Sequence, residues 1–305
     1  MQLPKTISTP AATVPCSTDV QLSNAAGDEY LIQVSWPLAW EDNVDSRPSV
    51  PIFYVLDGNA HFFTLVETVR RGLAVAASTD AVVVGIGYPD CGHYVFGNRR
   101  GYDLTPPTST YVPPRSWDGK EFTLPHGGAT ELLDFIQNIV RPHLLSEILP
   151  GFQPVKEVLA GHSFGGLCAL HALFSHAYCF DTFIAISPTI WWNDHFLLRE
   201  EKDFVQHMAS HSGKRPLSLY LSYGYYEQYP KRRKTYSDEE YAKRLAHALS
   251  LRTNDDIEDM ADRLGQSNLF NVVKAKGYAD EDHGSVAACG LGWAVCDALD
   301  DDRFA

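Results

Sequence analysis

Long apolar runs are missing from this sequence. No stretch reaches the roughly 18 apolar residues that a membrane-spanning helix needs. The first residues, Met-Gln-Leu-Pro-Lys-Thr-Ile-Ser-Thr-Pro, contain no apolar core of the kind found in secretion signals. Cysteine is sparse as well, because six in 305 residues cannot make a disulfide scaffold. These absences predict a cytoplasmic protein with reduced thiols and no membrane partner.

Positive charge is also in short supply. The chain has 25 Lys and Arg against 38 Asp and Glu, which gives a formal net charge of −13. This balance argues against nucleic acid or an anionic membrane as the main partner, because both are held by clustered Lys and Arg. The one basic run, Lys-Arg-Arg-Lys at residues 231–234, is too short to reverse it and is typical of a solvated loop.

Signatures of bound cofactors are missing too. The sequence contains no His-Glu-x-x-His, no paired Cys-x-x-Cys and no clustered ligands at zinc spacing. Gly85 and Gly87 lack the third glycine of a dinucleotide fingerprint, and residues 161–166 lack the lysine of a phosphate loop. The sequence therefore predicts no metal and no other cofactor.

The composition is that of one large folded domain with a substantial core. Hydrophobic residues make up 45 % and charged residues 21 % of the chain. Short apolar runs without alternation, typical of strands buried on both faces, take turns with helical patterns. We expect strands at residues 52–56, 81–87, 158–160, 183–188, 217–224 and 269–275, and helices at 60–77, 128–148 and 285–299. This order predicts an α/β fold with a mostly parallel central sheet and helices on both faces.

Three segments depart from this rhythm. Alternating residues at 19–22 and 30–36 predict a hairpin-like opening. Residues 88–126 are rich in Pro, Tyr, Gly and Arg and have no helical period, and about 228–265 is a second, charged excursion. Long excursions from a compact domain are usually functional, so we expect two insertions in a single domain, one a pocket wall and the other a lid.

The clearest chemical motif is Gly-His-Ser-Phe-Gly-Gly at residues 161–166. It follows a buried strand and precedes apolar residues at helical spacing, so Ser163 is expected on a sharp strand-to-helix turn. Glycine is expected to be needed at 161 and 165, because side chains at these positions would collide in so tight a turn. Such a turn lifts the hydroxyl clear of the sheet, as a nucleophile requires.

A serine nucleophile needs a histidine to take its proton and an acid to orient that histidine. In the chain order Ser, acid, His, the base follows the last strand, and only His283 does. Glu227 lies just past Gly224 at the carboxyl end of the penultimate strand, which favours it as the acid. Its rivals are Asp194, Asp280 and Asp282.

Stabilisation of the oxyanion requires two N–H groups that converge on one point. One is expected from Phe164, directly after the nucleophile, and the second from the backbone of Gly58 or Asn59 after the strand at 52–56. His162 is expected to point to the sheet side and to have no chemical role.

Several stretches together resemble the siderophore esterases of the α/β-hydrolase superfamily. In chain order they are Leu-Asp-Gly-Asn-Ala at 56–60, Gly-Ile-Gly-Tyr-Pro at 85–89, Arg-Arg-Gly-Tyr-Asp-Leu-Thr-Pro at 99–106, the run at 161–166, Ile-Ser-Pro-Thr-Ile-Trp-Trp at 186–192 and Asp-His-Gly-Ser at 282–285. The serine motif is common to many hydrolases. Its combination with the Arg-Arg and Ser-Pro-x-x-Trp-Trp stretches is much more specific.

The resemblance implies a serine esterase that cleaves backbone esters of iron-chelating macrocycles and so aids intracellular iron release. The substrates would be catecholate trilactones or fungal hydroxamate triesters such as triacetylfusarinine C, and the lack of an N-terminal anchor favours the second. It also implies that Arg99 or Arg100 holds a polar substrate group, with a structural salt bridge as the alternative. Tyr102, Trp191 and Trp192 are the further candidates for substrate contact.

Other functions fit the same residues, because fold does not fix substrate. They include a general carboxylesterase or S-formylglutathione-type thioesterase, an acyltransferase that uses the same acyl-enzyme, and a catalytically silent ligand-binding protein.

Overall fold

The central feature of the fold is one mixed sheet. The structure is a computed structural model that describes residues 14–40, 48–75, 78–175, 178–209 and 217–300. Within these residues, strands run in the order β1-β2-β4-β3-β5-β6-β7-β8. Their bounds are β1 Ser17–Ser23, β2 Glu29–Ser35, β3 Ile52–Leu56, β4 Val82–Gly87, β5 Glu157–His162, β6 Thr182–Ile186, β7 Leu217–Gly224 and β8 Phe270–Tyr278.

The sheet is parallel from β4 to β8 and antiparallel at one edge. Strand β2 pairs antiparallel with both β1 and β4, so the predicted opening hairpin forms that edge. The remaining pairs, β3 with β4 and β5, then β5-β6, β6-β7 and β7-β8, are parallel. Their carboxyl ends therefore meet at one edge of the sheet, where ligands bind in open α/β sheets.

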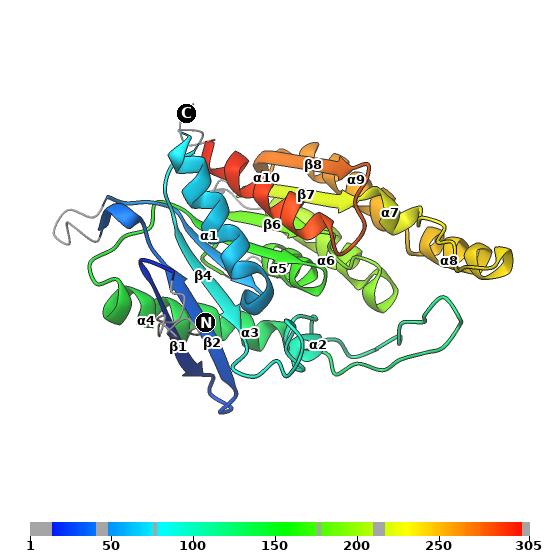
Figure 1. Cartoon of the computed structure of the whole chain (residues 1–305), viewed down its shortest axis with the longest axis horizontal. Helices are drawn as coiled ribbons and strands as arrows, with labels where there is room; N and C mark the ends of the chain where they lie inside the picture. Colours follow the sequence, from blue (N-terminus) through cyan, green and yellow to red (C-terminus); the bar gives the residue numbers. More distant parts are fainter. Residues whose placement is uncertain (1–13, 41–47, 76–77, 176–177, 210–216, 301–305) are drawn as a thin grey trace, which may run out of the picture.

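Helices cover both faces, as the apolar strands predict. Residues 53 and 55 of β3 pack into one core with α1 (Gly58–Ala74) and α10 (Val286–Asp300). Residues 52, 54 and 56 point the other way, because successive side chains alternate in a strand, and pack into a second core that includes α5 (Phe164–Ser175). Figure 1 shows α1 and α10 together on one side of the sheet.

The other helices match the predictions with small shifts. The helix expected at 60–77 ends at Ala74, and residues 76–77 lie outside the described residues. The helix expected at 128–148 is continuous but changes pitch along its length. Its parts are α3 (Ala129–Phe135), a π-helical turn η3 (Ile136–Val140), α4 (Arg141–His143) and a second π-helical turn η4 (Leu144–Ile148). In the loop expected at 37–51, a short 3₁₀ turn, η1, spans Leu38–Trp40.

The two predicted insertions need correction. Residues 88–126 contain a four-residue helix, α2 (Arg100–Asp103), too short to leave a helical period in the sequence. Of the segment 228–265, α8 (Asp238–Leu251) and the loop that leads to it extend beyond the sheet, as Figure 1 shows. Helix α9 (Thr253–Gly265) instead buries Ile257, Met260 and Leu264 against β7 and β8. It is not part of a lid, because a parallel β7-β8 pair requires a crossover helix between its strands.

Candidate active site

Ser163 occupies the turn between β5 and α5. Its backbone adopts φ 61°, a left-handed conformation, and its N–H donates to the carbonyl oxygen of Ile186 at 2.9 Å. A Cβ at Gly161 would lie 2.3 Å from the carbonyl of Gly165, so only glycine fits at 161. The prediction that glycine is needed at 165 is wrong, since a Cβ there would lie 3.4 Å from Leu56 Cβ, which is an ordinary contact.

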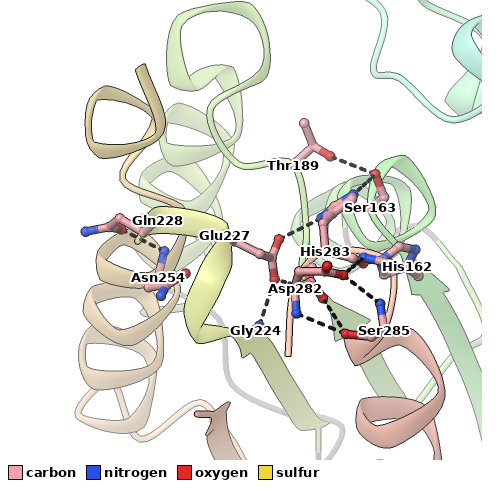
Figure 2. Close-up of polar contacts among 12 residues, drawn as sticks. His162, Ser163, Thr189, Gly224, Glu227, Gln228, Asn254, Asp282, His283 and Ser285 are labelled. Atoms are coloured by element: carbon pink, nitrogen blue, oxygen red, sulfur yellow. Dashed lines mark hydrogen bonds and ion pairs between the residues drawn. The ribbon is translucent and has the colours of Figure 1, made fainter. Parts of the chain in front are cut away.

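A chain of hydrogen bonds joins three side chains that are far apart in the sequence. His283 Nε2 lies 2.9 Å from Ser163 Oγ, and His283 Nδ1 lies 2.6 Å from Glu227 Oε2 (Figure 2). The His283 side chain is 52 % exposed and faces solvent, whereas that of Glu227 is 4 % exposed. The arrangement can take a proton from Ser163 on one ring nitrogen while the carboxylate orients the other.

Glu227 is held from several directions at the start of α7 (Tyr225–Gln228). Its Oε1 accepts hydrogen bonds from the Ser187 hydroxyl at 2.6 Å and from the Gly224 N–H at 2.7 Å. These bonds leave Oε2 directed at His283. Ser187 is a site residue that the sequence analysis missed, because Ser-Pro at the end of a strand reads only as a strand terminator.

The three rival acids lie elsewhere. Asp282 Oδ1 accepts from the N–H groups of Gly284 and Ser285, at 3.0 and 3.1 Å. The Ser285 N–H is the largest of the causes that lower the Asp282 pKa. Asp280 is exposed, and Asp194 belongs to the left-handed turn at the start of α6 (Trp192–Ala209). In the described part of the chain, no hydrogen bond joins any of the three to the His283 ring.

His162 contacts the loop that carries His283. Its Nε2 donates to the His283 carbonyl oxygen at 2.7 Å, and the two ring centres are 4.7 Å apart. Burial, together with the neighbouring rings of His283 and His61, lowers the pKa of His162 to about 3. The ring is therefore neutral and fixes the main chain at His283. The expectation that His162 has no chemical role stays a prediction, but its structural contact with the His283 carbonyl was not anticipated, because the sequence carries no signal for it.

The oxyanion candidates lie at two helix starts. Phe164 begins α5 and Gly58 and Asn59 begin α1, and the first N–H groups of a helix lack partners within it. The Asn59 side chain is occupied, because Oδ1 accepts from the Tyr88 N–H at 2.7 Å and Nδ2 donates to the Tyr88 carbonyl at 3.0 Å. Only its backbone N–H is left for an oxyanion.

Arg99 and Arg100 both form the salt bridges that the sequence left as the alternative. Arg100 donates to both oxygens of the buried Asp57 carboxylate, at 3.0 and 2.8 Å, and stacks over the Phe164 ring at 5.4 Å. It thereby fixes the turn before α1. Arg99 pairs with Asp103 at 3.0 Å and with Asp28.

The three aromatic residues that were predicted to contact substrate lie in different environments. The Tyr102 hydroxyl donates to Glu131 at 3.1 Å, and Trp191 lines a cavity of about 300 Å³ together with His195 and His247. Trp192 is fully buried, so the prediction that it contacts substrate is wrong. It packs against Tyr111, whose ring stacks on His126 at 3.8 Å, and so anchors the 105–127 segment.

Asn193 secures the same segment. Its amide donates to the Thr110 carbonyl at 3.0 Å and its Oδ1 accepts from the Val112 N–H at 2.7 Å. Asn193, Asp194 and His195 all have positive φ, between 49° and 56°. Three successive left-handed residues are strained. This turn links the first excursion to the end of β6.

The described residues include no group of three His, Cys, Asp or Glu side chains placed to hold a metal ion. In the same residues, every helix is too short or too polar to cross a bilayer.

The chain is similar to known esterases over most of its length. Residues 23–256 match the Esterase family model, described as "Putative esterase". The chain is 42 % identical over 277 residues to a siderophore enterobactin esterase of Emericella nidulans, with 90 % of this chain and 91 % of the relative covered. It is 41 % identical over 280 residues to a siderophore triacetylfusarinine C esterase of Aspergillus fumigatus, with 91 % of each covered.

The fold is similar to a solved structure over nearly its whole length. The siderophore hydrolase EstA from Aspergillus nidulans matches with a TM-score of 0.89 at 38 % identity, and 98 % of each chain is covered.

Proposed function

The chain belongs to the Esterase family of α/β-hydrolases, and on that premise we propose that it hydrolyses the ester bonds of a cyclic siderophore. Relatives named for enterobactin and for triacetylfusarinine C support this substrate class. The first substrate is a catecholate trilactone and the second a hydroxamate triester. Their shared chemistry is a macrocycle closed by carboxylic esters.

In the proposed mechanism, Ser163 Oγ attacks the ester carbonyl carbon while His283 Nε2 accepts the hydroxyl proton. The tetrahedral intermediate collapses, the C–O bond breaks, and the leaving alcohol oxygen takes that proton from His283. Water then attacks the acyl-serine carbonyl carbon and gives a proton to the same imidazole. The second tetrahedral intermediate collapses, the bond to Ser163 Oγ breaks, and Oγ takes that proton back from His283 as the acid is released. The observation that carries the mechanism is the continuous hydrogen-bond chain from Ser163 through His283 to Glu227.

The negative charge of each tetrahedral intermediate falls on the former carbonyl oxygen. The N–H of Phe164 and the N–H of Gly58 or Asn59 are the donors that we assign to it. Both come from helix N-termini, where the helix dipole also favours negative charge.

We place the reaction in the cytoplasm, where ester cleavage would release iron from a chelate that the cell has taken up. Six cysteines in 305 residues are too few for a disulfide scaffold, and this low count is typical of proteins of a reducing compartment. Cell fractionation followed by immunodetection tests this location, and recovery only from the culture medium would contradict it.

A substrate panel tests the proposed activity. The purified protein is incubated with iron-loaded triacetylfusarinine C, iron-loaded enterobactin, 4-nitrophenyl acetate and S-formylglutathione, and the products are identified by mass spectrometry. We expect stepwise opening of at least one macrocycle, with a higher kcat/KM than for the small esters. Cleavage of the small esters or the thioester alone would replace the proposal with a general carboxylesterase or a thioesterase.

A further inference from the structure

The basic run at residues 231–234 lines a cavity beside the active site. The cavity has a volume of about 450 Å³ and presents four cationic side chains: Lys231, Arg232, Arg233 and Arg244. The prediction that the run at 231–234 is a solvated loop did not anticipate that three of its residues line a cavity. Lys234, the last residue of the run, does not line the cavity.

The cavity shares its wall with the catalytic groups. Tyr226 and Asp282 line it, and each directly precedes a residue of the hydrogen-bond chain, Glu227 and His283 respectively. The Tyr226 N–H donates to the Glu281 carbonyl oxygen at 3.0 Å, which ties the two segments together. A ligand in the cavity therefore lies against the residues that directly precede Glu227 and His283 in the chain.

Aromatic rings hold the cationic groups in place. Lys231 Nζ lies 3.9 Å from the centre of the Tyr226 ring. The Arg244 guanidinium lies 3.9 Å from the Trp117 ring and 4.4 Å from the Tyr236 ring. Since Trp117 belongs to the 105–127 segment and Arg244 to α8, both excursions beyond the sheet contribute to this one cavity.

The cavity keeps an excess of positive charge. Arg244 pairs with Glu240 at 2.9 Å and Arg232 pairs with Asp238. In the described part of the chain, neither Lys231 nor Arg233 forms an ion pair. The only acid of the lining, Asp282, accepts hydrogen bonds from the two N–H groups that follow it, and the charge of Arg233 contributes to its lowered pKa. Its single negative charge offsets only part of the charge of Lys231 and Arg233. In a protein of net charge −13, such a concentration of cations attracts anions to one place.

We propose that this cavity is a subsite for multiply anionic, aromatic ligands, and that it lets the enzyme discriminate siderophores by the charge of their iron complex. The inference rests on the proposed function. Iron(III) bound by three catecholates is a trianionic complex with flat aromatic faces, whereas iron(III) bound by three hydroxamates is neutral. Cations that are held on aromatic rings can bind the catecholate complex, through ion pairing with its charge and stacking on its aromatic faces.

Charge-reversal variants test the subsite with a matched pair of substrates. Lys231→Glu, Arg233→Glu and the double variant are compared with wild type on iron-loaded enterobactin and iron-loaded triacetylfusarinine C. For the double variant we expect KM for the catecholate complex to rise about tenfold relative to that for the hydroxamate complex at low salt. The control Lys234→Glu lies outside the cavity and makes the same change in net charge as each single variant, and it should leave the ratio of the two KM values unchanged.

A non-hydrolysable probe separates binding from turnover. The iron(III) complex of an amide-linked tris-catecholate is used as an inhibitor of 4-nitrophenyl acetate hydrolysis. Its inhibition constant should rise in Lys231→Glu, in Arg233→Glu and in the double variant. Equal effects on both siderophores, or an inhibition constant that the variants do not change, would overturn the subsite. Failure of wild type to open either macrocycle, with the small ester still cleaved, would instead contradict the proposed function.

Discussion

The imidazole of His162 donates a hydrogen bond to the main-chain carbonyl oxygen of His283 at 2.7 Å. The residue directly before the proposed nucleophile thus fixes the loop that carries the proposed base. This contact couples two ends of the active site and gives the fold a specific acid sensitivity.

That sensitivity follows from the pKa of His162. The unfolded chain binds a proton there near the ordinary value of 6.5, whereas the folded chain does so only at about 3. Between these values the unfolded state holds more protons, so the free energy of unfolding falls as the pH falls, by up to about 1.4 kcal/mol per pH unit. His162→Gln should make this slope shallower, as measured by urea unfolding from about pH 6 to pH 4.

Burial also lowers the pKa of His61. In His162→Gln, His61 therefore still contributes its own part of the pH dependence of the free energy of unfolding. Parallel stability curves for wild type and His162→Gln would show that His162 is not held neutral in the folded protein.

Replacement of the nucleophile should abolish turnover. Ser163→Ala is expected to lower kcat by about 10⁴- to 10⁶-fold on ester substrates, because no other group forms the acyl-enzyme. Wild type should be labelled by a fluorophosphonate and the variant should not, with circular dichroism as the folding control. Labelling that persists in Ser163→Ala would refute the assignment, and a wild type that resists labelling would favour a catalytically silent protein.

The proposed acid can be separated from its neighbours by amide substitution. Glu227→Gln places an amide where the Nδ1–H of His283 needs an acceptor, and we expect kcat to fall by about 10²- to 10⁴-fold. Asp280→Asn, which alters an exposed acid in the same region, should leave kcat within about twofold of wild type. Similar losses in the two variants would remove the special role of Glu227.

Arg100 is expected to act on stability. Its removal leaves the fully buried Asp57 carboxylate without its bidentate partner, so Arg100→Gln should cost about 3 to 5 kcal/mol in urea unfolding. Asp57→Asn in that background should recover part of the loss. If instead stability holds and only KM rises, Arg100 binds substrate.

The tight turn offers a matched pair of glycine substitutions. Gly161→Ala places a methyl group 2.3 Å from backbone atoms of Gly165 and should destabilise the protein by about 3 kcal/mol or more. Gly165→Ala meets only ordinary contacts and should cost far less. Thermal unfolding of both variants decides the matter, and equal melting temperatures would show that the turn relaxes around a side chain at 161.

Much of the framework could be predicted because the signals are local. The bounds of β3 and β7 agree with the predicted strands residue for residue. A short, mostly apolar run is typical of a buried strand, so the sequence of the run is enough to predict it. The strand-to-helix turn at Ser163 was equally readable. Helix α2 could not be predicted, because a single helical turn leaves no period in the sequence. The packing of α9 could not be predicted either, because it depends on the pairing of the two strands that α9 connects.

The sequence by itself determined the alternation of strands and helices, the turn at Ser163 and the position of His283 after the last strand, because each depends on neighbours in the chain or on chain order. Only the tertiary structure decided which carboxylate touches His283, that Arg100 belongs to Asp57, that Trp192 is buried, and that the basic run lines a cavity with Trp117. Those contacts join residues that are distant in the chain. They exist because parallel strands bring their carboxyl ends, and the loops that follow them, to the same edge of the sheet.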